Sequence, residues 1–193
     1  MTEKTGRKEQ THQKMVEAAS RQFRSHGYAG IGVAGVAKAA GVTSGAFYDH
    51  FGSKDGAFAA ALGYGLDEVI DGIPKFQAEH GDRWIEAFAD YYLGNAHRDD
   101  RERVCAMTTL APDVARAGPD MNAIYEHKME TIVTLIAHGI SDGTEEDKRD
   151  RAWKLLSILI GGLTISRAVQ SGRLADEIAG LVKSAALSAV IGA

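Results

Sequence analysis

Residues 37–48 combine small and polar side chains in a spacing that suits contact with nucleic acid. A helix-turn-helix needs a small residue where its two helices cross, a turn glycine four residues later, and an apolar core residue six positions beyond it. Ala37, Gly41 and Phe47 meet these three requirements. The second helix then begins with residues 43–46, whose small side chains let the backbone approach DNA and whose free amides can hold a phosphate oxygen. The spacing therefore predicts that this helix enters the major groove.

Residues 11–62 resemble the N-terminal signature of the tetracycline-repressor (TetR) family of bacterial regulators. The likeness rests on the order and spacing of Phe23, Gly27-Tyr28, Val36-Ala37, residues 40–43 and residues 47–55. By this resemblance, phosphate contacts are expected from Thr43, Tyr48, His50 and Lys54, and contacts with base edges from Ser44, Gly45 and Ala46. The chain departs from many members at Ile31-Gly32, where they carry Thr-Ser, so the usual side-chain cap of the next helix is missing.

Several residues of this segment have a second interpretation. The aromatic side chains of Phe23, Tyr28, Phe47 and Phe51 are expected to form the small core of the head and to make no direct contact with DNA. Lys54 begins a helix, where a cation is unfavourable unless a phosphate lies nearby. A merely solvated lysine is the alternative at this position.

Charge is distributed unevenly along the chain. Residues 1–55 carry eight Lys and Arg against five Asp and Glu, whereas residues 56–193 carry 14 against 21. A basic head on an acidic body suits a protein that offers one surface to a polyanion. We therefore expect a DNA-binding domain over residues 1–55 and a ligand-binding and dimerisation domain over residues 56–193.

Apolar residues recur with helical periodicity and no stretch alternates with period two for long, so the sequence predicts an all-α fold of about nine helices. Residues 1–9 lack this period and are predicted to be a frayed tail. Helices are expected over residues 10–26, 33–40, 44–50, 54–72, 82–96, 102–116, 120–138, 144–171 and 175–189. Pro74 is predicted to mark a new start after the fourth helix, and Thr144 to open a capping box with Asp147 in place of glutamate.

The helix predicted over residues 144–171 is apolar nearly all round, so it must be covered on several sides. Its Gly161-Gly162 pair lowers helix propensity by about 2 kcal/mol, which the close approach of another helix would offset. The resemblance implies a homodimer through the last two helices, with an interface expected at Leu159, Gly162, Leu163, Ser166, Ile178 and Leu181. A helix buried wholly within one chain is the alternative.

The resemblance also implies an effector pocket in the body. The candidates are aromatic and sulfur-containing residues with helical spacing: Trp84, Phe88, Tyr91, Tyr92, Cys105, Met107, Met121, Tyr125 and Met129. Such stripes belong to a core more often than to a ligand site. The aromatic face of residues 84–92 favours a small, largely apolar effector with one or two polar groups.

The leading hypothesis is a cytoplasmic, homodimeric transcriptional repressor that a small molecule releases from a palindromic DNA operator. A thiol switch at Cys105, flanked by Arg101 and Arg103, is a second hypothesis, with a small buried apolar side chain as its alternative. A helical binding protein or enzyme that retains a helix-turn-helix is the third. Against it, the sequence shows no nucleophile–base arrangement, no phosphate-binding glycine loop and no metal-ligand spacing among His80, His97, His127 and His138. Neither a cofactor, a metal nor a membrane segment is expected.

Overall fold

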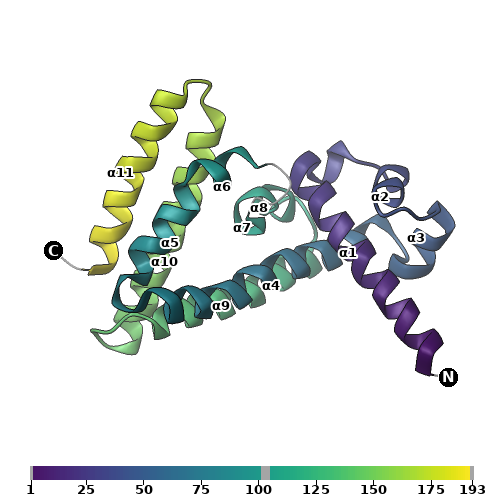
Figure 1. The fold of residues 1–193 in the computed structure, drawn as a ribbon, viewed down its shortest axis with the longest axis horizontal. Helices are drawn as coiled ribbons and strands as arrows, with labels where there is room; N and C mark the ends of the chain where they lie inside the picture. The colour runs from purple at the N-terminus through teal and green to yellow at the C-terminus, as the bar shows by residue number, and fades with distance from the viewer. Residues whose placement is uncertain (1, 101–104, 192–193) are drawn as a thin grey trace.

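The computed structural model describes the backbone of residues 2–100 and 105–191, with side chains from residue 8 to 100 and 105 to 190. The described residues form α-helices and one short 3-10 helix, without strands, which confirms the predicted all-α fold (Figure 1). No helix among them is both long and apolar enough to cross a membrane.

The N-terminal head consists of α1 (Thr2–Gly30), α2 (Val33–Ala39) and α3 (Ser44–Phe51). The helix-turn-helix is formed by α2 and α3, and Gly41 between them has a φ of +68°, a conformation that side chains with a Cβ rarely adopt. Gly32, the N-cap residue of α2, provides no side-chain hydrogen bond, as the sequence predicts. The prediction of a frayed tail is wrong, since α1 already begins at Thr2. Residues 1–9 are rich in Glu and Lys, which extend a helix without needing an apolar face.

Helix α4 (Lys54–His80) is a single helix that leaves the head and runs the length of the body (Figure 1). The prediction that Pro74 starts a new helix is wrong, because Pro74 lies inside α4. Proline removes one backbone hydrogen bond and normally interrupts a helix. Here Ile73 is fully buried beside it and α4 packs along α9 (Pro119–His138), so tertiary packing outweighs the local preference.

The segment after α4 is divided more finely than the sequence predicts. A 3-10 turn, η1 (Gly81–Arg83), leads to α5 (Trp84–Leu93), which ends where Gly94 adopts an extended conformation. The remainder of the predicted helix over residues 82–96 belongs to α6 (Asn95–Asp99). The helix predicted over residues 102–116 is also wrong: its described part consists of two single turns, α7 (Ala106–Thr109) and α8 (Ala111–Val114), with Pro112 at the start of the second.

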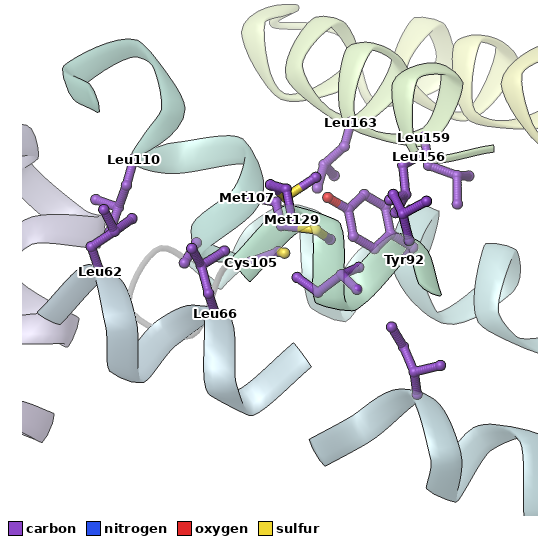
Figure 2. Close-up of a cluster of buried hydrophobic side chains, with 14 of the residues drawn as sticks. Leu62, Leu66, Tyr92, Cys105, Met107, Leu110, Met129, Leu156, Leu159 and Leu163 are labelled. Atoms are coloured by element: carbon purple, nitrogen blue, oxygen red, sulfur yellow. The ribbon is translucent and has the colours of Figure 1, made fainter. Parts of the chain in front are cut away.

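The last two helices, α10 (Glu145–Ala168) and α11 (Gly172–Ile191), pack against each other at the end of the molecule away from the head (Figure 1). The predicted capping box is confirmed: Thr144 accepts a hydrogen bond from the amide of Asp147, whose carboxylate accepts one from the amide of Thr144. Buried side chains of α4, α5, α7, α9 and α10 meet in one continuous core that includes Tyr92, Met107, Met129, Leu156 and Leu159 (Figure 2).

Gly162 marks a close contact between α10 and α11. A Cβ atom at this position would lie 2.3 Å from Cγ1 of Val182 and 2.5 Å from its Cγ2. The close approach expected at the glycine pair is therefore made, at Gly162, by α11 of the same chain. At Gly161, in contrast, a Cβ atom would meet nothing within 4 Å.

We predict that Gly162→Ala lowers the free energy of unfolding by about 1–3 kcal/mol, because the branched side chain of Val182 cannot rotate away from the new methyl group. Gly63→Ala on α4 is the matched control, since its Cβ atom meets nothing within 4 Å. Its better helix propensity should raise the stability by up to about 1 kcal/mol. Urea unfolding monitored by circular dichroism measures both changes. A Gly162→Ala protein as stable as the wild type would show that α11 does not approach α10 here.

Candidate DNA-binding face and ligand cavity

The residues expected to contact DNA lie on α3 and on the first turn of α4. Thr43, Ser44 and Gly45 are exposed, and Tyr48 exposes 52% of its surface. Phe47 between them is fully buried and fixes α3 against the head. The arrangement presents the N-terminal end of α3 to solvent, while Ala46 and His50 are half-buried.

Hydroxyl groups cap both helices that approach this face. The Oγ1 atom of Thr43 accepts a hydrogen bond from the amide of Ala46 at 3.2 Å, and the Oγ atom of Ser53 accepts one from Gly56 at 2.9 Å. Each hydroxyl uses a lone pair for the cap and keeps its proton as a donor. Thr43 can therefore cap α3 and donate to a phosphate oxygen at the same time.

Tyr28 holds Lys54 in a defined position. The Nζ atom of Lys54 lies 4.2 Å from the centre of the Tyr28 ring, and the Tyr28 hydroxyl donates a hydrogen bond to Asp55. This hydrogen bond, with burial, raises the pKa of Tyr28. His50 likewise has a neighbour from α1, because its Nδ1 atom lies 3.3 Å from Nδ1 of His12. Neither contact could be predicted from the sequence, because each joins residues far apart in the chain.

A cavity of about 360 Å³, partly open to solvent, lies where the head meets the body, and we call it the α1–α4 cavity. Its walls come from α1, α4, α5, α6 and the start of α7. The aromatic part is formed by Tyr64, Phe76, Phe88, Tyr91 and Tyr92, and the polar part by Glu17, Ser20, Arg21, Arg24, Glu68 and His97.

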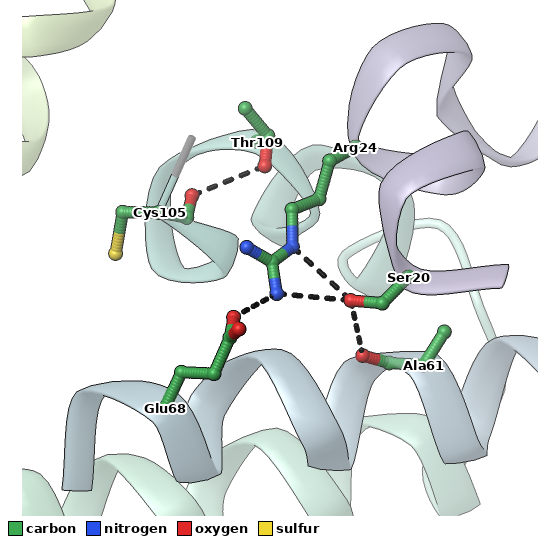
Figure 3. Close-up of polar contacts among 6 residues, drawn as sticks. All are labelled: Ser20, Arg24, Ala61, Glu68, Cys105 and Thr109. Carbon is green, nitrogen blue, oxygen red and sulfur yellow. Dashed lines mark hydrogen bonds and ion pairs between the residues drawn. The ribbon is translucent and has the colours of Figure 1, made fainter. Parts of the chain in front are cut away.

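Arg24 of α1 forms the polar centre of this cavity. Its side chain is 6% exposed and pairs with Glu68 of α4. The guanidinium also donates to Ser20 Oγ at 2.9 and 3.1 Å, and Ser20 Oγ donates to the carbonyl of Ala61 at 3.2 Å (Figure 3). This network connects the head helix α1 to the middle of α4.

The aromatic wall is tightly packed. The ring of Phe76 makes an edge contact with the ring of Phe88, with 5.7 Å between the ring centres. The ring centre of His97 lies 5.1 Å from those of Tyr91 and Tyr92. Burial lowers the pKa of His97, with the charge of Arg167 acting in the same direction, so the imidazole is neutral at pH 7. Its Nε2 atom is buried without a hydrogen-bond partner among the described residues. A ligand group could bond there.

The expected pocket residues separate into two groups in the structure. Five line the α1–α4 cavity: Phe88, Tyr91, Tyr92, Cys105 and Met107. The other four lie outside its walls. The indole of Trp84 donates to the carbonyl of Gly139 at 2.9 Å, and the hydroxyl of Tyr125 donates to the carbonyl of Met107 at 3.3 Å. Met129 belongs to the core, and Met121 lies in a surface crevice beside Tyr28.

The environment of Cys105 disfavours a thiol switch. The residue is 6% exposed, and burial raises the pKa of its thiol. A protonated thiol is a poor nucleophile. Arg101 and Arg103, which the switch hypothesis invoked, lie outside the described residues.

Four of the residues expected at a dimer interface are covered by their own chain. Leu159 and Leu163 are 0% exposed, Ser166 is 3% exposed and Gly162 contacts Val182. These residues have little surface left for a second chain. Ile178 is half-buried, whereas Leu181 exposes 67% of its surface.

Sequence comparison relates the chain to known regulators. Residues 15–61 match the family model described as bacterial regulatory proteins, tetR family. The HTH-type transcriptional regulatory protein RaaS of Mycobacterium tuberculosis is 24% identical over 153 residues, which cover 78% of this chain and 68% of that protein.

Solved structures share the fold over nearly the whole chain. The reduced form of NemR from Escherichia coli superposes with a TM-score of 0.75 at 18% identity, covering 91% of this chain and 96% of NemR. A TetR-family regulator from Cytophaga hutchinsonii gives a TM-score of 0.77 at 16% identity, covering 97% and 98%. The match over the head and the regulator relative support a DNA-binding regulator of the TetR family, and the solved structures show that the chain has the fold of such regulators.

Proposed function

We propose that the chain is a homodimeric, cytoplasmic repressor that leaves a palindromic operator when a small molecule occupies the α1–α4 cavity. One observation carries this proposal. Ser20, Arg21 and Arg24, which belong to the head helix α1, line the same cavity as Phe88 and Met107 of the body. A ligand there touches both parts, so it can favour one orientation of the head over another.

The cavity also indicates the kind of effector. Its volume lies near the lower end of the range of small-molecule sites, about 300–1,000 Å³. Aromatic rings supply an apolar wall, and the unpaired Nε2 atom of His97 supplies one polar contact. We therefore propose a small, largely apolar effector with one hydrogen-bonding group. The burial of Cys105 and the raised pKa of its thiol do not favour a thiol switch. The relative RaaS is a transcriptional regulator, which does not favour an enzyme.

Exposed apolar residues support dimerisation through the last two helices. Five large hydrophobic side chains are exposed among the described residues, and three of these are Ile165 of α10 and Leu174 and Leu181 of α11. Leu174, Ile178, Leu181 and Ala185 recur at intervals of three and four residues, which places them along one face of α11. We propose that this face, with Ile165, contacts a second copy, in place of the buried Leu159, Gly162, Leu163 and Ser166.

For the DNA-binding face, we predict that Lys54→Ala weakens binding to all DNA sequences. Loss of one phosphate contact should also lower the slope of log K against log salt concentration by about 0.9. Lys75→Ala, which removes the same charge from an exposed position of α4, is the control and should leave the slope unchanged. Fluorescence anisotropy over a range of salt concentrations measures this, using an operator selected from random DNA. An unaltered slope in Lys54→Ala would exclude the phosphate contact.

For the cavity, we predict that Gly72→Phe yields a repressor that binds the operator but does not respond to the effector. Gly72 lines the α1–α4 cavity, and a Cβ atom there meets nothing within 4 Å, so the new ring can occupy the ligand volume. Gly63→Phe is the matched control, because Gly63 has the same free space but does not line the cavity.

Compounds are first screened for release of the operator from the wild type, and the variants are then titrated. Coupling of about 1–3 kcal/mol predicts a 5- to 150-fold weakening of operator binding in the wild type and in Gly63→Phe. Release of Gly72→Phe at the same effector concentration would place the effector site elsewhere.

For the dimer, we predict that Leu181→Glu produces monomers with weak operator binding, because a charge at the centre of an apolar interface cannot be desolvated at low cost. Leu181 is exposed within one chain, so the substitution spares the fold. Ala78→Glu adds the same charge to an exposed position of α4 and should remain dimeric. Sedimentation velocity distinguishes the two. A dimeric Leu181→Glu protein would refute this interface.

A further inference from the structure

A second cavity, of about 680 Å³, lies between α6, the turn joining α10 to α11, and the end of α1. Arg24 lines it as well as the α1–α4 cavity, but the other walls differ. We call it the arginine pocket, because Arg24, Arg98 and Arg167 reach it from three separate elements. Polar groups of Ser25, Asn95 and Gln170 complete much of the lining.

The donors of this lining favour an anion. The lining carries three guanidinium groups and two carboxylates, those of Asp99 and Asp176. Arg24 is also paired with Glu68, which lies outside the lining, so the pocket has little excess charge and an anion would be held by directed donors within a concave site. Guanidinium groups also match the planar geometry of carboxylate and phosphate oxygens.

Arg98 carries the strongest indication of a ligand. Its side chain is only 9% exposed. The Nη2 atom donates to Asp176 of α11 and to Asn95, but Nη1 is buried and has no hydrogen-bond partner among the described residues. A buried charged donor without an acceptor is strongly unfavourable, and such atoms in folded proteins call for an acceptor. The pocket that Arg98 lines is where that acceptor can lie.

We propose that the arginine pocket binds a small oxyanion, a molecule with a carboxylate or phosphate group, and that Nη1 of Arg98 is its anchoring donor. The volume lies within the range of small-molecule sites, so the pocket holds an anionic metabolite as readily as a free phosphate ion. This site is separate from the proposed effector cavity and does not depend on operator release.

The experiment uses the full chain without DNA, in chloride buffer at constant ionic strength. Inorganic phosphate and citrate are titrated separately by isothermal calorimetry, and the binding of either supports the site and identifies its preferred anion. Saturable binding is expected in the wild type, with at least a tenfold loss in Arg98→Gln. Arg83→Gln is the control, since its side chain is 82% exposed and lies outside the pocket.

Two further variants keep the test decisive. Asp176→Asn removes the carboxylate that competes for Arg98, so it should strengthen anion binding several-fold, a gain that misfolding cannot produce. Lys54→Gln tests binding at the DNA-binding face and should leave the affinity unchanged. The proposal is overturned if the wild type binds neither anion at millimolar concentration, or if Arg98→Gln binds as the wild type does. It is equally overturned if Asp176→Asn shows no gain, or if binding is lost in Lys54→Gln.

Discussion

Three helices meet at Gly65 of α4, where the backbone leaves no room for a side chain. A Cβ atom there would lie 2.7 Å from the Cβ atom of Ala106 on α7 and 2.8 Å from an Nη2 atom of Arg24 on α1. Because residue 65 is glycine, α1 of the head, α4 and α7 of the cavity wall can all come into contact at this position. The position of the head on the body depends on this contact, because a larger residue would separate α7 from α4.

The ion pair of Arg24 with Glu68, beside Gly65, affects the orientation of α1 more than the free energy of folding. Arg24 is almost fully buried, but Glu68 keeps 47% of its side chain in solvent. Solvent screens such a pair, so its net contribution to folding is small. The guanidinium nevertheless makes directional bonds to Ser20 and Glu68, and Ser20 bonds to Ala61 of α4. Hydrogen bonds are directional, so they fix the rotation of α1 about its axis relative to α4. Apolar contacts, such as that of Phe23 with Phe58, restrict this rotation less.

The sequence predicts those features that local chemistry determines. Gly41, Thr43 and Thr144 mark turns and caps through hydrogen bonds within a few residues, so α2, α3 and the start of α10 could be placed in advance. The continuation of α4 through Pro74 could not be predicted from the sequence, because it depends on the packing of α4 against α9. The cavity was predicted only on its α5 and α7 side. Ser20 and Arg24 are four residues apart and therefore share one face of α1, and only the tertiary fold brings that face to Tyr92 and Cys105.

Besides the contacts of Ser20 and Phe23 with α4, two polar contacts of α1 attach the head to the body, and they constrain how occupancy of the cavity could reach the DNA-binding face. Besides Arg24, the amide of Tyr28 donates to Asp113 of α8 at 2.8 Å. Two attachments hold the orientation of a rigid element, whereas one would act as a hinge. Asp113 follows Met107 of the cavity wall by six residues, across the short turns α7 and α8. In the proposed mechanism, a displacement of α7 would be passed to Asp113 and so to Tyr28, whose ring lies under Lys54 at the DNA-binding face.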